Sequence, residues 1–120
     1  MSYVDGFVVP VPKRKVELYK KLARICGKVW REHGALDYME CITDDVSWGK
    51  RTSFPRSVKM TKTETVFFSY IVYKSRKHRD QVMAKVMKDP RLQHMMDPKK
   101  HPFDAKRMIF GGFKVVVDAK

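Results

Sequence analysis

Two acidic residues stand inside segments that are otherwise apolar. Asp5 lies in YVDGFVVPV, residues 3–11, and Glu40 lies in LDYMECIT, residues 36–43. Both segments are rich in β-branched and aromatic residues, which predicts β-strands. A carboxylate buried in such a strand is costly unless a cation pairs with it, and burial also shifts its pKa. Asp5 and Glu40 are therefore the first candidates for ligand binding or acid–base chemistry.

Lys106 and Arg107 lie near the start of a third apolar segment, HPFDAKRMIFGGFKVVV, residues 101–117. We expect this segment to be a strand beside the first one, so that Arg107 can contact Asp5. Three interpretations of the acidic residues remain open: a buried ion pair that fixes strand register or a dimer interface, a group that grips a ligand or transfers a proton, and solvent exposure at a strand end. Arg107 joins Asp5 and Glu40 as a candidate catalytic residue, and Lys106, Tyr70 and Trp48 are candidates for lining a ligand pocket.

The Gly111–Gly112 pair needs a physical reason, because glycine weakens a strand. We expect a β-bulge or a close approach of the backbone in a curved sheet, and a ligand approach point is the alternative. On the first interpretation, Gly112→Val should disrupt dimerisation.

The remaining reactive side chains show no catalytic or metal-binding spacing. The four histidines lack HxxxH or HxH spacing, and we expect no metal site and no cofactor. Cys26 and Cys41 lack CxxC spacing, which predicts reduced thiols in the cytoplasm. His33, at the end of a predicted helix, is expected to act as a cap.

The hydrophobic pattern predicts a single α+β domain over residues 1–120 with ferredoxin-like βαββαβ order. Apolar residues recur every three or four positions from Lys13 to His33, which predicts a helix ended by Gly34. The other expected elements are a strand at 64–73, a helix capped by Ser75, a new helix start at Asp89–Pro90, a turn-rich connection over DPKKHPFD, and strands at 3–11, 36–43 and 101–117. Right-handed crossovers would place both helices on one face of a four-stranded antiparallel sheet.

The other face of that sheet is expected to be covered. Both sets of alternating residues in ETVFFSYIVY, residues 64–73, are apolar or aromatic, whereas a half-solvated strand should alternate with charge. Two classes of protein cover such a face differently: homodimers that pack sheet to sheet, and RNA-binding modules that stack bases on aromatic side chains. The basic-Gly-aromatic signature of the second class is missing from the 64–73 strand, which favours the homodimer.

The net charge of +13 favours acidic partners, nucleic acid among them. Most basic residues nevertheless fall opposite the apolar stripes of the two helices, where charge usually belongs to a solvated face. No stretch approaches the length that spans a membrane.

Several segments carry a resemblance to a known family. The segments are YVDGFVV, GALDYMEC, SYIVYKSRKHRD, DPR and PFDAKRMIFGGF. Together they resemble the YbaA-like family of small uncharacterised bacterial proteins, which belongs to the dimeric α+β barrel superfamily. The resemblance implies a ferredoxin-like fold and a homodimer, and it implies no established activity. This chain departs from the family in its strongly basic net charge.

These observations predict a homodimeric protein with a small-molecule pocket, or a cofactor-free enzyme of the dimeric α+β barrel type. The alternative is a nucleic-acid-binding protein that uses its basic helix faces, whose binding should weaken steeply with salt.

Overall fold

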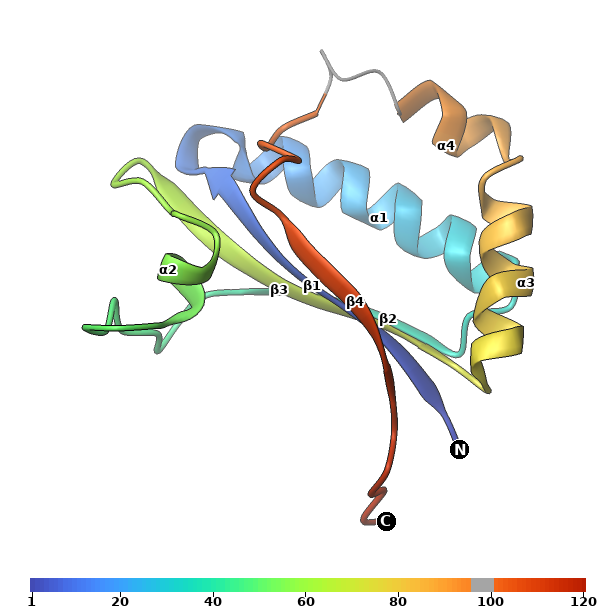
Figure 1. Ribbon diagram of the computed structural model, residues 1–120. Coiled ribbons are helices and arrows are strands. Elements are labelled where there is room, and N and C mark those ends of the chain that lie inside the picture. The colour runs from blue at the N-terminus through green and yellow to red at the C-terminus, as the bar shows by residue number, and fades with distance from the viewer. Residues whose placement is uncertain (96–100) are drawn as a thin grey trace.

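The fold is a four-stranded antiparallel sheet with helices packed on one face (Figure 1). The computed structural model describes residues 1–95 and 101–120, without the side chain of His94. Met96 and the first part of the expected turn-rich connection lie outside the described residues. The elements in chain order are β1 (Tyr3–Pro12), the short 3-10 helix η1 (Lys13–Lys15), α1 (Val16–Glu32), β2 (Asp37–Ile42), α2 (Phe54–Ser57), β3 (Glu64–Tyr73), α3 (Arg76–Val86), α4 (Pro90–Met95) and β4 (Ile109–Lys114).

The strand order β2-β3-β1-β4 confirms the ferredoxin-like prediction. The two crossovers, through α1 and through α3 with α4, join parallel strands of the same sheet. Right-handed crossovers place both connections on one face. Figure 1 shows α1, α3 and α4 together on that face, with the short α2 on the opposite side.

Most helix boundaries follow from local chemistry. Gly34 ends α1 with a φ of +114°, a conformation that glycine adopts without strain. The Ser75 side chain accepts a hydrogen bond from the backbone N–H of His78 and so caps α3. At α4, the Asp89 carboxylate accepts from the backbone N–H of Arg91, as the Asp-Pro start predicted. β3 has the predicted bounds of 64–73.

Alternation along β1 and β3 divides their side chains between the two faces of the sheet. The helix side of the sheet carries Val9, Val11 and Phe67, which pack against Tyr19 and Ala23 of α1. A second cluster joins the other end of the sheet to α1, α3 and α4; it contains Tyr3, Val29, Ala35, Ile71, Tyr73, Val82, Val86 and Leu92.

The predicted strand at 101–117 is wrong over residues 101–108 and 115–117, because β4 runs only from Ile109 to Lys114. The Asp104 carboxylate accepts hydrogen bonds from the backbone N–H of Lys106 and from Nε of Arg107, which folds this segment into a turn. Nη1 of Arg107 donates to the carbonyl of Lys59 at 2.9 Å. The turn is thereby anchored to the loop between α2 and β3.

The Gly111–Gly112 pair does not form a bulge, because β4 pairs with β1 in unbroken register. Gly112 lies opposite Asp5, on the helix side of the sheet. A Cβ atom at Gly112 would lie 2.7 Å from Cε2 of Tyr3, so the Tyr3 ring occupies the space that a side chain would need. Of the predicted bulge and close approach, only a close approach is present, and the group that approaches Gly112 is the Tyr3 side chain and not a backbone segment.

The face of the sheet opposite the helices is largely apolar and open. Four of its large side chains are exposed: Met39, Phe68, Ile109 and Phe113. At one end, the segment that contains α2 covers part of this face, where Val58 packs on Val8 and Val66. Phe54 meets Phe68 edge-on at 5.8 Å between ring centroids.

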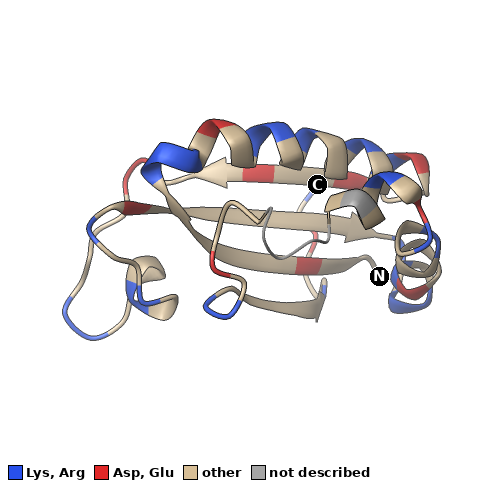
Figure 2. Cartoon of the chain, turned by 90° about the horizontal axis from the view of Figure 1, so that it is seen from above, with Lys and Arg blue, Asp and Glu red and all other residues tan. Residues whose placement is uncertain are grey.

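The basic residues of α1 line its outer surface (Figure 2). Lys21, Arg24, Lys28 and Arg31 are all exposed, as expected for a solvated helix face. None of the helices in the described part of the chain combines the length and apolar character that crossing a bilayer requires.

Candidate functional site

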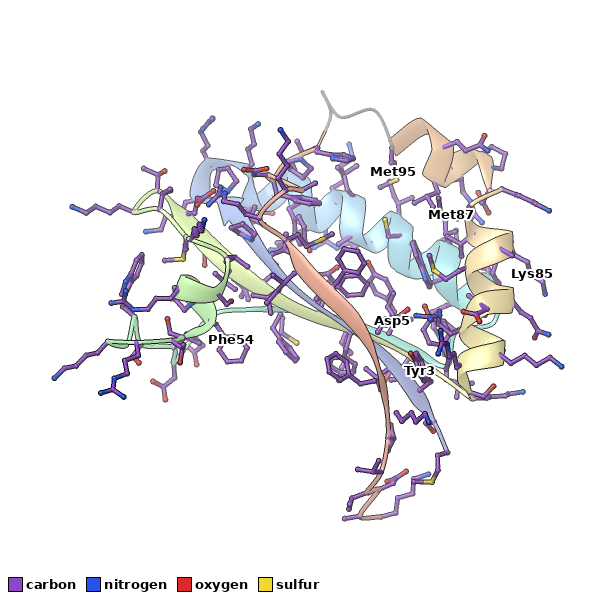
Figure 3. The ribbon with its side chains drawn as sticks, viewed as in Figure 1. Tyr3, Asp5, Phe54, Lys85, Met87 and Met95 are labelled. Atoms are coloured by element: carbon purple, nitrogen blue, oxygen red, sulfur yellow. The ribbon has the colours of Figure 1, made fainter. Side chains whose placement is uncertain are left out.

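A cavity of about 730 Å³ lies between the helix side of the sheet and the helical layer. Its volume falls in the ~300–1,000 Å³ range of small-molecule sites. Many of the side chains that line it are aromatic or methionine, among them Phe7, Trp30, Phe103, Phe110, Met83, Met87, Met95 and Met108. Figure 3 shows Asp5 below this space and Met87 and Met95 above it.

Glu40 of β2 lies in the wall of the cavity and is held by tyrosine hydroxyls. Tyr19 of α1 donates to Oε2 at 2.9 Å, and Tyr38 donates to Oε1 at 3.1 Å. Alternation along β2 brings Glu40 to the helix side of the sheet together with Tyr38. The two hydroxyls fix the carboxylate in one orientation.

Burial raises the pKa of Glu40, and the hydrogen bonds from Tyr19, Tyr38 and Ser69 only partly oppose this effect. The same surroundings raise the pKa of both tyrosines, since burial beside a carboxylate disfavours a second negative charge. Burial, with a smaller effect of Glu40, raises the pKa of the nearby Cys26 thiol to about 11. Burial therefore raises the pKa of all four acidic groups at this end of the cavity: Glu40, Tyr19, Tyr38 and Cys26.

Asp5 also lines the cavity, and its partner is Arg79 of α3. Nη1 of Arg79 donates to Oδ1 of Asp5 at 2.6 Å, and the Tyr3 ring lies against the guanidinium, 5.0 Å from centroid to Cζ. Burial raises the pKa of Asp5 in spite of the opposing charge of Arg79 and a hydrogen bond from Tyr73. Asp5 is thus a paired carboxylate, unlike Glu40.

The expected Asp5–Arg107 contact is wrong. Arg107 instead forms a two-pronged ion pair with Glu64, with Nη1 to Oε1 at 2.9 Å and Nη2 to Oε2 at 2.5 Å. It lies in the turn before β4, because that strand begins two residues later than Arg107. Arg107 does not line the cavity, and its described contacts are structural.

The three other residues expected in a pocket also lie outside the cavity. Lys106 is exposed in the 104–107 turn. Tyr70 is on the open face of the sheet beside Phe68, because its position in β3 faces away from the helices. Trp48 is in the loop before α2, where the Arg56 guanidinium lies over its ring at 5.9 Å.

Asp5 and Glu40 share one cavity but are far apart. Glu40 pairs with Ser69, which pairs with Phe7, two residues beyond Asp5 on β1. Two strand spacings and two residue rises place their Cα atoms ~12 Å apart. The two acids therefore extend from separate points of the cavity wall.

Sequence reasoning missed Tyr19, Tyr38 and Arg79. Tyr19 and Tyr38 resemble ordinary core residues, and their role appears only when α1 packs over β2. Arg79 looked like one more basic residue on a helix. Its spacing of three and seven from the buried Val82 and Val86 is the signal that could have placed it on the inner face of α3.

Within residues 1–95 and 101–120, no group of three His, Cys, Asp or Glu side chains could hold a metal ion. Nε2 of His33 lies 2.9 Å from the Asp89 carboxylate, so this histidine links the end of α1 to the start of α4. His101 lines the cavity and stacks on Phe103 at 5.6 Å. Cys41 is exposed and outside the cavity.

Comparison with known proteins places this chain in a family. Residues 2–105 match the profile of a family described as "Protein of unknown function (DUF1428)". The chain belongs to this family. The uncharacterised protein YbaA of Escherichia coli K12 is 44% identical over 118 residues, covering 98% of this chain and 99% of YbaA. YbaA of Shigella flexneri matches with the same identity and coverage. The resemblance to YbaA-like proteins is confirmed.

The fold of this chain can also be compared with those of solved structures. A putative antibiotic biosynthesis monooxygenase from Nitrosomonas europaea superposes with a TM-score of 0.62 at 16% identity, covering 96% of this chain and 90% of that one. At this identity the likeness shows the fold alone, a four-stranded antiparallel sheet with helices on one face.

Proposed function

We propose that the protein binds a small organic molecule in the cavity between its sheet and its helices. The observation that carries this proposal is a cavity of about 730 Å³ with apolar walls and a fixed carboxylate, Glu40, in its lining. Ligand sites combine a mostly apolar lining with a few oriented polar groups in the same way. Asp5 and Arg79 provide a second polar point at the other end.

The chemistry that these residues support best is proton transfer without a cofactor. Burial raises the pKa of Glu40, which makes its carboxylate a stronger base toward a bound ligand than that of an exposed glutamate. The tyrosine hydroxyls hold Glu40 in place for that transfer. The neighbour of known fold is named as a putative monooxygenase, which supports a role in small-molecule chemistry for this fold but names no substrate here.

The proposal includes a homodimer formed through the open face of the sheet. Phe68 and Phe113 are 43% and 64% exposed on that face. Apolar patches of this kind mark interaction surfaces on soluble proteins. A second copy that packs sheet to sheet would bury them without closing the cavity, because the cavity lies on the opposite side of the sheet. Since both cysteines are free thiols, we place the dimer in the cytoplasm.

Nucleic-acid binding, the alternative suggested by the net charge, receives no support from the family or from the fold neighbour. The sheet face that would stack bases also lacks the arrangement of basic and aromatic residues that such modules use. We do not propose it.

The proposal can be tested with the neutral fluorescent dye N-phenyl-1-naphthylamine, whose emission rises in apolar cavities. Ala84 faces the cavity from α3, so Ala84→Trp should fill part of the space and weaken dye binding by about tenfold or more. Ala119→Trp, in the exposed chain end, is the matched control and should bind like the parent. Equal dye binding by the parent and by Ala84→Trp would refute cavity binding.

A further inference from the structure

The charges that line the cavity differ in sign from those of the whole chain. The chain has 26 Lys and Arg against 13 Asp and Glu. The described residues that line the cavity include three acids, Asp5, Glu40 and Asp80. Of the Lys and Arg residues, the described lining includes one, Arg79. The described lining of the cavity therefore holds more acidic than basic side chains, although the chain as a whole is strongly basic.

Glu40 is the acid of this set without an ionic partner among the described residues. Arg79 pairs with both Asp5 and Asp80, at 2.6 and 2.8 Å. The groups that donate to Glu40 are neutral hydroxyls, and no described Lys, Arg or His lies within ion-pair distance of it. A buried carboxylate without a cation is costly, and a cationic ligand would remove that cost.

Two aromatic pairs include the tyrosines that bind Glu40. Trp30 lies 6.1 Å from Tyr38, and Tyr19 lies 5.8 Å from Phe103, between ring centroids. All four rings line the cavity together with Glu40. The faces of such rings attract organic cations, and aromatic cages are a common means of holding ammonium groups.

From these three observations we infer that the cavity selects an organic cation, an apolar molecule whose amine nitrogen lies against Glu40 between the aromatic rings. The inference rests on the proposed function and names the ligand class of the same site. The methionine-lined part of the cavity, formed by Met83, Met87 and Met95, takes the apolar body of the ligand.

Four probes that share one ring system separate the possibilities. They are 1-naphthylmethylamine, the quaternary (1-naphthylmethyl)trimethylammonium, the neutral 1-naphthylmethanol and the anionic 1-naphthylacetate, each titrated by calorimetry at pH 7.5. We expect the two cations to bind at least about tenfold more tightly than the alcohol, and the anion to bind most weakly. The quaternary probe has no nitrogen-bound proton, so its binding shows recognition of charge.

Glu40→Gln keeps the shape of the side chain and removes its charge. This change should reduce the affinity for both cations by about tenfold or more and leave the alcohol nearly unaffected. Glu17→Gln is the matched control, since Glu17 is on the surface of α1 with a side chain 84% exposed. It should change neither affinity.

The outcomes separate this inference about ligand charge from the proposal that the cavity binds a small molecule. If the alcohol binds as tightly as the cations, or Glu40→Gln leaves cation binding unchanged, the cavity binds ligands but does not select cations. If the quaternary probe fails where the primary amine binds, an N–H hydrogen bond to Glu40 and not the charge alone carries recognition, and the inference is wrong. If none of the four probes and no neutral dye binds, the cavity function itself fails. Should Glu40→Gln not fold, the ranking of the four probes on the parent protein decides.

Discussion

Arg79 donates a 2.6 Å hydrogen bond to Asp5 from 74 positions away in the chain. This contact joins α3 to β1, at the end of the cavity opposite Glu40. The Tyr3 ring covers the guanidinium, so the pair is shielded from solvent and the Arg79 side chain is 21% exposed. The position of α3 over the sheet, and with it one wall of the cavity, depends on this pair.

Arg79→Met should destabilise the protein by about 2 to 4 kcal/mol at pH 7, because it leaves the Asp5 carboxylate buried without a cation. The loss should shrink at low pH, where protonation of Asp5 removes its charge. Urea denaturation at pH 7 and pH 4 measures both values, and Arg76→Met, on the exposed side of the same helix, is the control. An Asp5→Asn change added to Arg79→Met should restore part of the stability. A loss that is independent of pH would contradict this account.

The Glu64–Arg107 pair should make the protein sensitive to acid. Hydrogen bonds from Arg107 lower the pKa of Glu64 from 4.5 to about 2, and the Glu64 side chain is 6% exposed. Because the folded-state pKa is lower than the unfolded one, the stabilisation is present above pH 4.5 and is lost as the pH falls toward 2. Glu64→Gln should cost roughly 2 to 3 kcal/mol at pH 7 and much less at pH 2.5. Unfolding curves across this range test it, with Glu17→Gln as control; a constant difference would count against the pair.

The two neighbouring glycines of β4 should respond differently to alanine. At Gly112 the new Cβ would overlap the Tyr3 ring, whereas at Gly111 it would lie 3.6 Å from Cε1 of Phe113, an ordinary contact. Gly112→Ala should therefore cost about 1 to 3 kcal/mol by displacing Tyr3 from Arg79. Gly111→Ala should be near neutral or slightly stabilising. Thermal and urea unfolding compare the two, and equal effects would show that Tyr3 does not fill the space over Gly112.

The hydroxyl groups around Glu40 should control its pKa. Tyr38→Phe removes one donor to the carboxylate, so the pKa of Glu40 should rise further above its usual value. Carbon-13 NMR of the labelled side-chain carboxyl group measures this titration. Because the folded-state pKa is raised, protonation of Glu40 stabilises the fold at low pH, and this contribution is lost as the pH rises through that value. The stability of Glu40→Gln relative to the parent should accordingly increase with pH; no change with pH would mean that Glu40 titrates as in the unfolded chain.

The open face of the sheet should determine the oligomeric state. Phe68→Glu places a charge in the centre of that face and should convert a dimer to a monomer, which light scattering after size exclusion measures directly. Leu18→Glu makes the same kind of change on the exposed side of α1 and should leave the dimer intact. A parent protein that is monomeric at micromolar concentration would overturn the proposed assembly.

The order of elements was predictable because it depends on local patterns. The run of β-branched and aromatic residues in 64–73 marks β3, and Gly34 and Ser75 act as helix caps through their own backbone and side-chain chemistry. The strand predicted at 101–117 failed for a non-local reason. Arg107 binds the Glu64 carboxylate and the Lys59 carbonyl, more than 40 positions away, and no periodicity in the segment encodes those partners.

Of the residues that form the site, only the two acids could be predicted from the sequence. Asp5 and Glu40 were identifiable because a carboxylate stands out in an apolar strand, and both do line the cavity. Their partners were not, since many Lys and Arg residues compete for the role that Arg79 takes. The tyrosines that hold Glu40 come from a helix and from the same strand, a combination that depends on how α1 packs over β2.

The cavity has walls of two different kinds. Around Glu40 they are rings held by hydrogen bonds and by one another, whereas on the helical side they include Met83, Met87 and Met95. Unbranched thioether side chains change conformation at little cost and repack around objects of different shape. The end near Glu40 should therefore discriminate among ligands by charge, while the methionine end tolerates differences in their size. The protein would then bind a family of related compounds rather than a single one.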